Sequence, residues 1–158
     1  MPERKINIPP LPLTGGCQCG AVRYSIKSAP VAFYVCHCTE CQHQSASAFG
    51  ESLQVNADDL EVTGETSLVS RQTATGRTME GRFCPKCGSR IFHRIAGGSP
   101  FANVRAGTLD DTSWLVPAAH IWASSKQPWV VLPDDGFVFD QQPDVAMVRA
   151  RWKEMTGA

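Results

Sequence analysis

Seven cysteines, gathered in three closely spaced groups, constrain this 158-residue chain more than any other feature. The groups are Cys17-x-Cys19, Cys36-x-Cys38-x-x-Cys41 and Cys84-x-x-Cys87. An odd number of cysteines cannot all form pairs, and cysteines one residue apart are poor partners for an unstrained disulfide. We see no secretory signal and expect a reducing cytoplasmic location, where clustered cysteines indicate metal binding. The spacing therefore predicts zinc ligands.

The spacing also divides the cysteines between two metal sites. Structural zinc is closed by four protein ligands, whereas catalytic zinc has three and keeps one position open. The two cysteine pairs suit the closed site, because residues i and i+2 of a strand point the same way and a C-x-x-C loop followed by Gly88 is a zinc knuckle. We predict structural zinc at Cys17, Cys19, Cys84 and Cys87, and catalytic zinc at Cys36, Cys38 and Cys41.

One competing division is a plain zinc ribbon. It would combine Cys38 and Cys41 with Cys84 and Cys87, and it would leave three cysteines without a role. In another alternative the cysteines are buried apolar residues or free thiols, which does not account for their spacing. The division into four and three explains all seven residues.

A zinc ion with three thiolate ligands has particular chemistry. Three negative ligands outweigh the charge of the metal, so bound water should be a weaker acid than on a three-histidine site. The open position suits a soft ligand such as an incoming thiol, which coordination would deprotonate and hold as a nucleophile. The predicted reaction class is addition of a thiolate to a small electrophile, or the reverse cleavage of a carbon–sulfur bond.

Alternating apolar and polar residues predict a mainly β chain, punctuated by turns rich in glycine, proline and aspartate. The predicted strands span residues 21–27, 31–35, 49–55, 67–71, 78–83, 90–95, 101–105, 119–123 and 129–132. Between them the turn-forming clusters leave no stretch long enough for a linker. Most of the chain is therefore expected to form one β-rich domain.

Two helices complete the predicted fold. A short helix over residues 39–47 would be capped by Thr39, and a C-terminal helix over residues 144–155 would be capped by Asp144. In the second helix, apolar residues fall on one face; they are Val145, Val148, Trp152 and Met155. Residues 1–13 contain four prolines and are expected to form an extended N-terminal arm, followed by a single zinc-binding domain over residues 14–158.

Charge and hydropathy narrow the range of partners. The chain has 15 basic and 15 acidic residues, so no broad basic excess favours binding to nucleic acid. No apolar run is long enough to span a bilayer, and no membrane partner is expected. The oligomeric state is left open, with a homodimer as one option.

Seven short segments resemble, in order, the motifs of the glutathione-dependent formaldehyde-activating enzyme family, which includes centromere protein V-like relatives. The segments are TGGCQCGAVRY (14–24), CHCTEC (36–41), SASAFG (45–50), FCPKCGS (83–89), AGTLDD (106–111), HIW (120–122) and PW (128–129). The resemblance implies a zinc-binding β-tent fold and the same assignment of cysteines to the two zinc sites. It also implies condensation of formaldehyde with glutathione to S-hydroxymethylglutathione, a carbon–sulfur lyase activity.

The sequence departs from the family pattern next to the open site. Gln42 and His43 stand where the family commonly has two basic residues, which are suited to recognising the carboxylates of glutathione. His43 could be a fourth zinc ligand or a proton shuttle, although a surface histidine on a short helix is the more common case. His37 is interpreted as structural, because it should point away from the metal.

A few other residues could contact a substrate. In a strand over residues 119–124, His120, Trp122 and Ser124 would share one face. The scattered arginines Arg71, Arg77 and Arg82 could hold an anionic substrate, but such residues are usually solvated.

Two hypotheses follow for the function. In the first, the chain is an enzyme, a zinc-dependent carbon–sulfur lyase that binds one structural and one catalytic zinc ion. It would present a small thiol, with glutathione as the first candidate, to formaldehyde or a related small carbonyl compound. In the second, the chain is a non-catalytic zinc-binding module that interacts with a protein. The open coordination position is the feature that distinguishes them.

Overall fold

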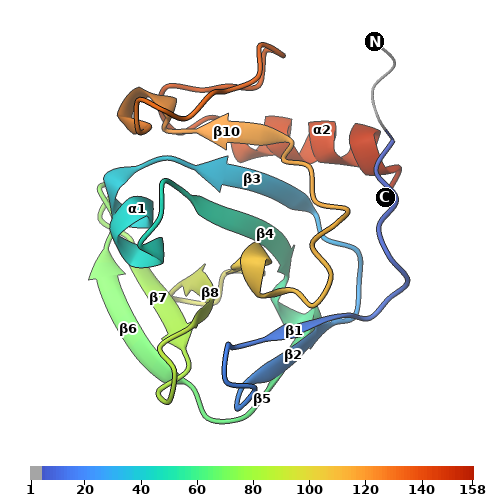
Figure 1. The fold of residues 1–158 in the computed structure, drawn as a ribbon, viewed down its shortest axis with the longest axis vertical. Coiled ribbons are helices and arrows are strands. Elements are labelled where there is room, and N and C mark those ends of the chain that lie inside the picture. Colours follow the sequence, from blue (N-terminus) through green and yellow to red (C-terminus); the bar gives the residue numbers. More distant parts are fainter. Residues whose placement is uncertain (1–4) are drawn as a thin grey trace. The chain divides into compact units, whose positions relative to one another are not determined.

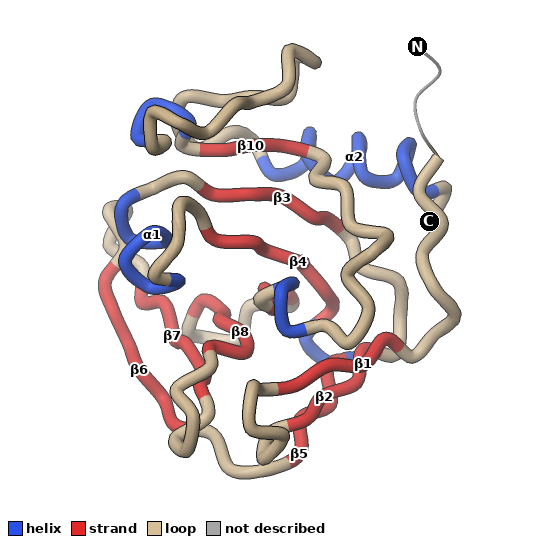
Figure 2. Tube along the Cα trace, in the orientation of Figure 1, coloured by secondary structure: helices blue, strands red, loops and turns tan. Residues whose placement is uncertain are grey.

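The computed structural model describes residues 5–158 and shows a mainly β fold (Figure 1; Figure 2), as predicted. No helix in this part of the chain is long and apolar enough to cross a membrane. The strands are β1 (Leu13–Gly16), β2 (Arg23–Ile26), β3 (Ala32–Cys36), β4 (Gly50–Asn56), β5 (Leu60–Thr63), β6 (Ser67–Gln72), β7 (Thr78–Phe83), β8 (Arg90–Ile95), β9 (Phe101–Val104) and β10 (Ala119–Ile121). The helices are α1 (Thr39–Ser45), α2 (Val145–Thr156) and the short 3-10 helices η1 (Ala57–Asp59), η2 (Ala106–Thr108) and η3 (Ala123–Ser125).

The described residues form two compact units, each assembled from separate stretches of chain. The first unit contains residues 5–8, 31–53 and 114–158, and the second contains residues 9–30 and 54–113. The N-terminal arm predicted for residues 1–13 lies partly outside the described residues, and residues 5–12 contain no strand or helix. The single domain over residues 14–158 stays a prediction.

The first unit packs α2 against β3. Strand β10 runs parallel to β3, with Ile121 opposite Cys36. On α2, Val145 of the predicted apolar face is half-buried, whereas Val148, Met155 and Trp152 are buried, with Trp152 only 1% exposed. Its ring meets those of Phe33 and Trp114, with 6.2 Å between ring centroids in each pair. As predicted, Asp144 caps the helix by accepting a hydrogen bond from the backbone N–H of Ala146.

The second unit contains two groups of strands. Strands β1, β2 and β5 form one antiparallel sheet, and β9, β8, β7 and β6 are hydrogen-bonded in that order as antiparallel neighbours. The bounds predicted for β7 and β8 match those observed. Buried apolar side chains on these strands include Ile26, Ile91 and Val104, each fully enclosed. Two of the turns between these strands, after β1 and after β7, contain the cysteines described below.

Two predicted strands near the C-terminal end differ from the structure. The strand predicted over residues 119–123 ends at Ile121, because Trp122 adopts a left-handed conformation with φ 56° and starts η3 instead. Residues 129–132 lie in a loop, with Trp129 70% exposed and Val131 92% exposed. This apolar run lies between Pro128 and Pro133, which cannot donate to a strand ladder.

Candidate metal centres

Four cysteines gather in the second unit, in the grouping that the spacing predicted. Cys17 and Cys19 follow β1, and Cys84 and Cys87 lie in the turn between β7 and β8. Their sulfurs all lie within 4.8 Å of one another. The Sγ of Cys19 is 3.6 Å from that of Cys17 and 3.8 Å from that of Cys84. Tetrahedral zinc with bonds of about 2.3 Å places its sulfur ligands about 3.8 Å apart, so the donor set and its spacing fit zinc.

The knuckle between β7 and β8 is shaped by its own backbone. The N–H of Gly88 donates to the carbonyl of Cys84 at 2.8 Å, and the N–H of Cys84 donates to the carbonyl of Ser89 at 2.9 Å. Gly88 has φ 78°, a left-handed conformation that costs glycine little. A bond of 3.1 Å from the N–H of Gln18 to the Ser89 hydroxyl joins this knuckle to the turn after β1.

Hydrogen bonds also prepare two of the four sulfurs to be thiolates, the form that binds metal. The backbone N–H of Val22 donates to the Sγ of Cys17 at 3.2 Å and lowers the pKa of that thiol. The hydroxyl of Ser89 lies 3.2 Å from the Sγ of Cys87 and is the main reason that its pKa falls to about 5. Such bonds favour the charged form and orient the ligands.

Three further cysteines gather in the first unit. Cys36 ends β3, Cys38 precedes α1, and Cys41 lies in the first turn of that helix. Their sulfurs also lie within 4.8 Å of one another, and Cys36 is buried while the other two are half-buried. The neighbouring thiols of Cys38 and Cys41 raise the pKa of Cys36. Three sulfurs this close could together hold a metal ion, whose positive charge would offset the mutual repulsion of their thiolates.

The cap of α1 differs from the prediction. The helix is capped by the Sγ of Cys38, which accepts a hydrogen bond of 3.3 Å from the N–H of Cys41, and not by Thr39. His43 lies outside the group of three sulfurs, and its Nδ1 lies 2.8 Å from the carbonyl oxygen of Thr39 on the exposed side of the helix. The described residues therefore offer three cysteines and no fourth His, Cys, Asp or Glu ligand at this cluster.

The two histidines of the sequence motifs lie together in the first unit. His37 is completely buried, and its Nε2 is 3.0 Å from the Nδ1 of His120. The ring of Phe49 meets His37 edge-on, with 5.5 Å between centroids. Burial, with a smaller effect of His120, lowers the pKa of His37 to about 4, so this imidazole is neutral at pH 7. The face that we predicted His120, Trp122 and Ser124 to share is absent, because β10 ends at Ile121 and only His120 belongs to the strand.

Gln42 has a structural role that the sequence did not reveal. Its Nε2 donates to the carbonyl of His37 at 2.8 Å and to the carbonyl of Ser125 at 2.9 Å. Its Oε1 accepts a bond of 3.3 Å from Gln127. This amide joins α1 to the segment after β10, which lies more than 80 residues further along the chain. Gln42 therefore holds together the segments around the three cysteines.

Replacing Gln42 with alanine is expected to lower the free energy of unfolding by about 1–3 kcal/mol, because the carbonyls of His37 and Ser125 each lose the hydrogen bond that Gln42 donates. Urea unfolding of the zinc-loaded protein would measure this change. Gln141→Ala is the matched control, since its exposed side chain makes no such bonds, and it should change stability by less than about 0.5 kcal/mol. Equal stability of the two variants would contradict the role given to Gln42.

The fold and the two clusters define a class of protein, a mainly β chain with a four-cysteine and a three-cysteine cluster whose sulfurs could each hold a metal ion. Residues 12–125 match the family described as glutathione-dependent formaldehyde-activating enzyme. The chain belongs to that family.

Two similar proteins extend over much of the chain. A curated protein of Halomonas elongata, named "Putative glutathione-dependent formaldehyde-activating enzyme", is 27% identical over 153 residues, which cover 92% of this chain and 96% of that protein. A crystal structure of a Rhodobacter sphaeroides protein is 23% identical, with a TM-score of 0.49. That match covers 62% of this chain and 88% of the other.

Proposed function

We propose that this chain is a zinc-dependent carbon–sulfur lyase of the glutathione-dependent formaldehyde-activating type, acting in the cytoplasm. It would add a small thiol, with glutathione as the first candidate, to formaldehyde or a related small carbonyl compound. One observation carries the proposal. Cys36, Cys38 and Cys41 bring three sulfurs within 4.8 Å of one another without a fourth ligand among the described residues. Membership of the family supports the choice of reaction.

The proposed reaction needs little acid–base chemistry from the protein. When bound, the zinc ion would supply an open position that lowers the pKa of an incoming thiol and holds it as a thiolate. A carbon–sulfur bond then forms between the thiolate and the carbonyl carbon, and the carbonyl oxygen takes up a proton. The chain contributes by holding its ligands rigidly, with Cys36 on β3 and Cys38 and Cys41 on the start of α1.

We propose a structural role for the other cluster. Cys17, Cys19, Cys84 and Cys87 would close a zinc site with no open position, and this site would join the turn after β1 to the turn between β7 and β8. All four ligands lie within the second unit. Such a site contributes directly to the free energy of folding, since the ligands come together only in the folded chain.

Metal analysis and thiol titration test the enzyme hypothesis. The purified protein should bind two zinc ions per chain. After cobalt replaces the zinc, the visible absorption spectrum should show two metal sites rich in thiolate ligands. Added glutathione should change the spectrum of one site only, and S-methylglutathione, whose sulfur cannot become a thiolate, should not. Formation of S-hydroxymethylglutathione from formaldehyde should exceed the uncatalysed rate.

A different result would favour the second hypothesis. If the three-cysteine cluster binds no metal, or if a thiol never reaches that metal, the chain is better described as a non-catalytic zinc-binding interaction module. A wild-type protein that binds two metal ions but gives no rate above background with several small carbonyl compounds would also count against the lyase proposal.

A further inference from the structure

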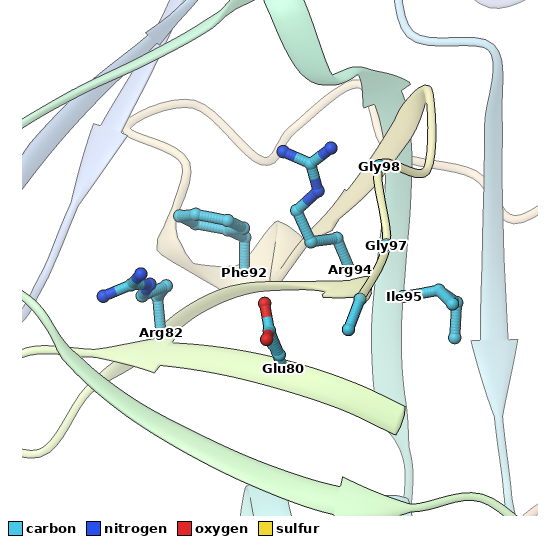
Figure 3. Close-up of a pocket in the computed structure, with 8 residues that line it drawn as sticks. Glu80, Arg82, Phe92, Arg94, Ile95, Gly97 and Gly98 are labelled. Atoms are coloured by element: carbon cyan, nitrogen blue, oxygen red, sulfur yellow. The ribbon is translucent and has the colours of Figure 1, made fainter. Parts of the chain in front are cut away.

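A cavity of about 400 Å³ lies in the second unit, on a face of β7 and β8 remote in sequence from the three-cysteine cluster. The glycine-rich turn after β8 completes its wall (Figure 3). The residues lining it are Glu80, Arg82, Phe92, Arg94 and the segment 95–98. A cavity of this size accommodates a small-molecule ligand, and nothing in the proposed zinc chemistry uses it.

The register of the strands brings the polar residues to one face. Glu80 of β7 stands opposite Arg94 of β8, and Arg82 stands opposite Phe92. Residues i and i+2 of a strand point to the same face, with Cα atoms about 7 Å apart. Figure 3 shows Glu80, Phe92 and Arg94 pointing to the same side of the two strands. One small ligand could therefore contact both kinds of charge and the aromatic ring.

The charges in this cavity do not satisfy one another. Within residues 5–158, neither Glu80 nor Arg82 forms an ion pair or a side-chain hydrogen bond. Arg94 is directly opposite Glu80 but donates from one terminal nitrogen to the carbonyl of Ser99 at 2.6 Å. Its Nε is buried without a hydrogen-bond partner. A carboxylate and two guanidinium groups thus line one cavity, and each could form further hydrogen bonds with a ligand.

The turn after β8 holds Arg94 in place. Gly97 and Gly98 have φ values of 92° and 91°, a conformation that other residues rarely adopt. They bring the carbonyl of Ser99 back to the guanidinium of Arg94. The hydroxyl of Ser99 also accepts a bond of 3.3 Å from the N–H of Phe101, which fastens the turn to β9. A guanidinium held in this way is ready to bind a carboxylate without a further ordering cost.

We propose that this cavity binds a small molecule that carries one ammonium group and two carboxylate groups. Glu80 would accept hydrogen bonds from the ammonium group, while Arg82 and Arg94 would each bind a carboxylate. The ring of Phe92 would cover the aliphatic part and attract the ammonium group. A simple dicarboxylate fits less well, because Glu80 would then remain unpaired beside two negative charges.

Two kinds of molecule share this chemistry, a free acidic amino acid and a γ-glutamyl thiol peptide such as glutathione. The proposal uses only residues of the second unit and none of the cysteines. It does not rest on the proposed function, so its failure would leave the lyase activity untouched.

Calorimetric titration of the zinc-loaded full chain tests the proposal with matched ligands. L-glutamate carries all three charges, glutarate lacks the ammonium group, and L-glutamine lacks one carboxylate. S-methylglutathione represents the peptide and cannot bind metal as a thiolate. At least one of L-glutamate and S-methylglutathione should bind, and the one that binds more tightly should do so roughly tenfold or more tightly than either glutarate or L-glutamine. Tighter binding of S-methylglutathione would identify the peptide as the ligand, and tighter binding of L-glutamate would identify the free amino acid.

Four variants locate the binding. Glu80→Gln and Arg82→Gln should each weaken binding of the preferred ligand by roughly tenfold or more. Glu65→Gln and Arg77→Gln change the charge equally at exposed positions and should bind as the wild type does. Equal zinc content would show that all four are folded. The proposal is overturned if neither ligand binds, if glutarate binds as tightly as the preferred ligand, or if the cavity variants match their controls.

Discussion

Replacing Cys84 with serine is expected to unfold the second unit or to destabilise it by about 5 kcal/mol or more, which is comparable with the net stability of an ordinary domain. Cys84 is completely buried, and its sulfur belongs to the four-cysteine cluster. Serine has nearly the same shape but supplies no thiolate, so the proposed structural zinc would lose one of its four ligands. Circular dichroism during thermal unfolding, together with zinc analysis, would measure the effect.

Two controls separate metal loss from a packing defect. Removal of zinc from the wild type by a strong chelator should reproduce the loss of structure, since both treatments would take the metal from the four-cysteine cluster. Gln18→Ala changes an exposed side chain between Cys17 and Cys19 of the same cluster and leaves the backbone bond to Ser89 intact, so it should remain stable. A folded Cys84→Ser protein that retains all its zinc would show that the cluster is not structural.

Replacing Cys38 with serine is expected to abolish the proposed activity and to leave a folded protein with one zinc ion. The loss should exceed roughly a hundredfold, the upper range for residues that only support metal ligands. Cys38 also caps α1, but serine is among the best helix caps. The substitution therefore removes a thiolate while it preserves the local fold, which makes it a clean test. Initial rates with formaldehyde and glutathione, and zinc per chain, are the measurements.

His43→Ala is the matched control on the same helix. The His43 side chain lies outside the group of three sulfurs, so this variant should keep its activity and both zinc ions. Loss of structure to the same extent in Cys38→Ser and Cys84→Ser would contradict the division of labour between the two clusters.

The strands and the helix that could be predicted have strong local signals. Strands β7 and β8 have the predicted bounds because turn-forming residues flank them on both sides. Helix α2 lies where apolar residues recur at helical spacing, and Val148, Trp152 and Met155 are buried as expected. The missed strand β1 contains Gly15 and Gly16, which rarely form strands. No side chain fits at Gly15, because Tyr24 and the backbone of Thr108 occupy the space.

What the sequence by itself determined was the grouping of the cysteines. Residue type and spacing are local properties, and the seven cysteines divide into four and three, as they do in the structure. Only the tertiary structure decided the role of Gln42 and the composition of the cavity around Glu80. The Gln42 amide bonds depend on Ser125, a residue 83 positions away. The cavity depends on the register that sets Glu80 opposite Arg94, and a shift of one residue would move these side chains to opposite faces.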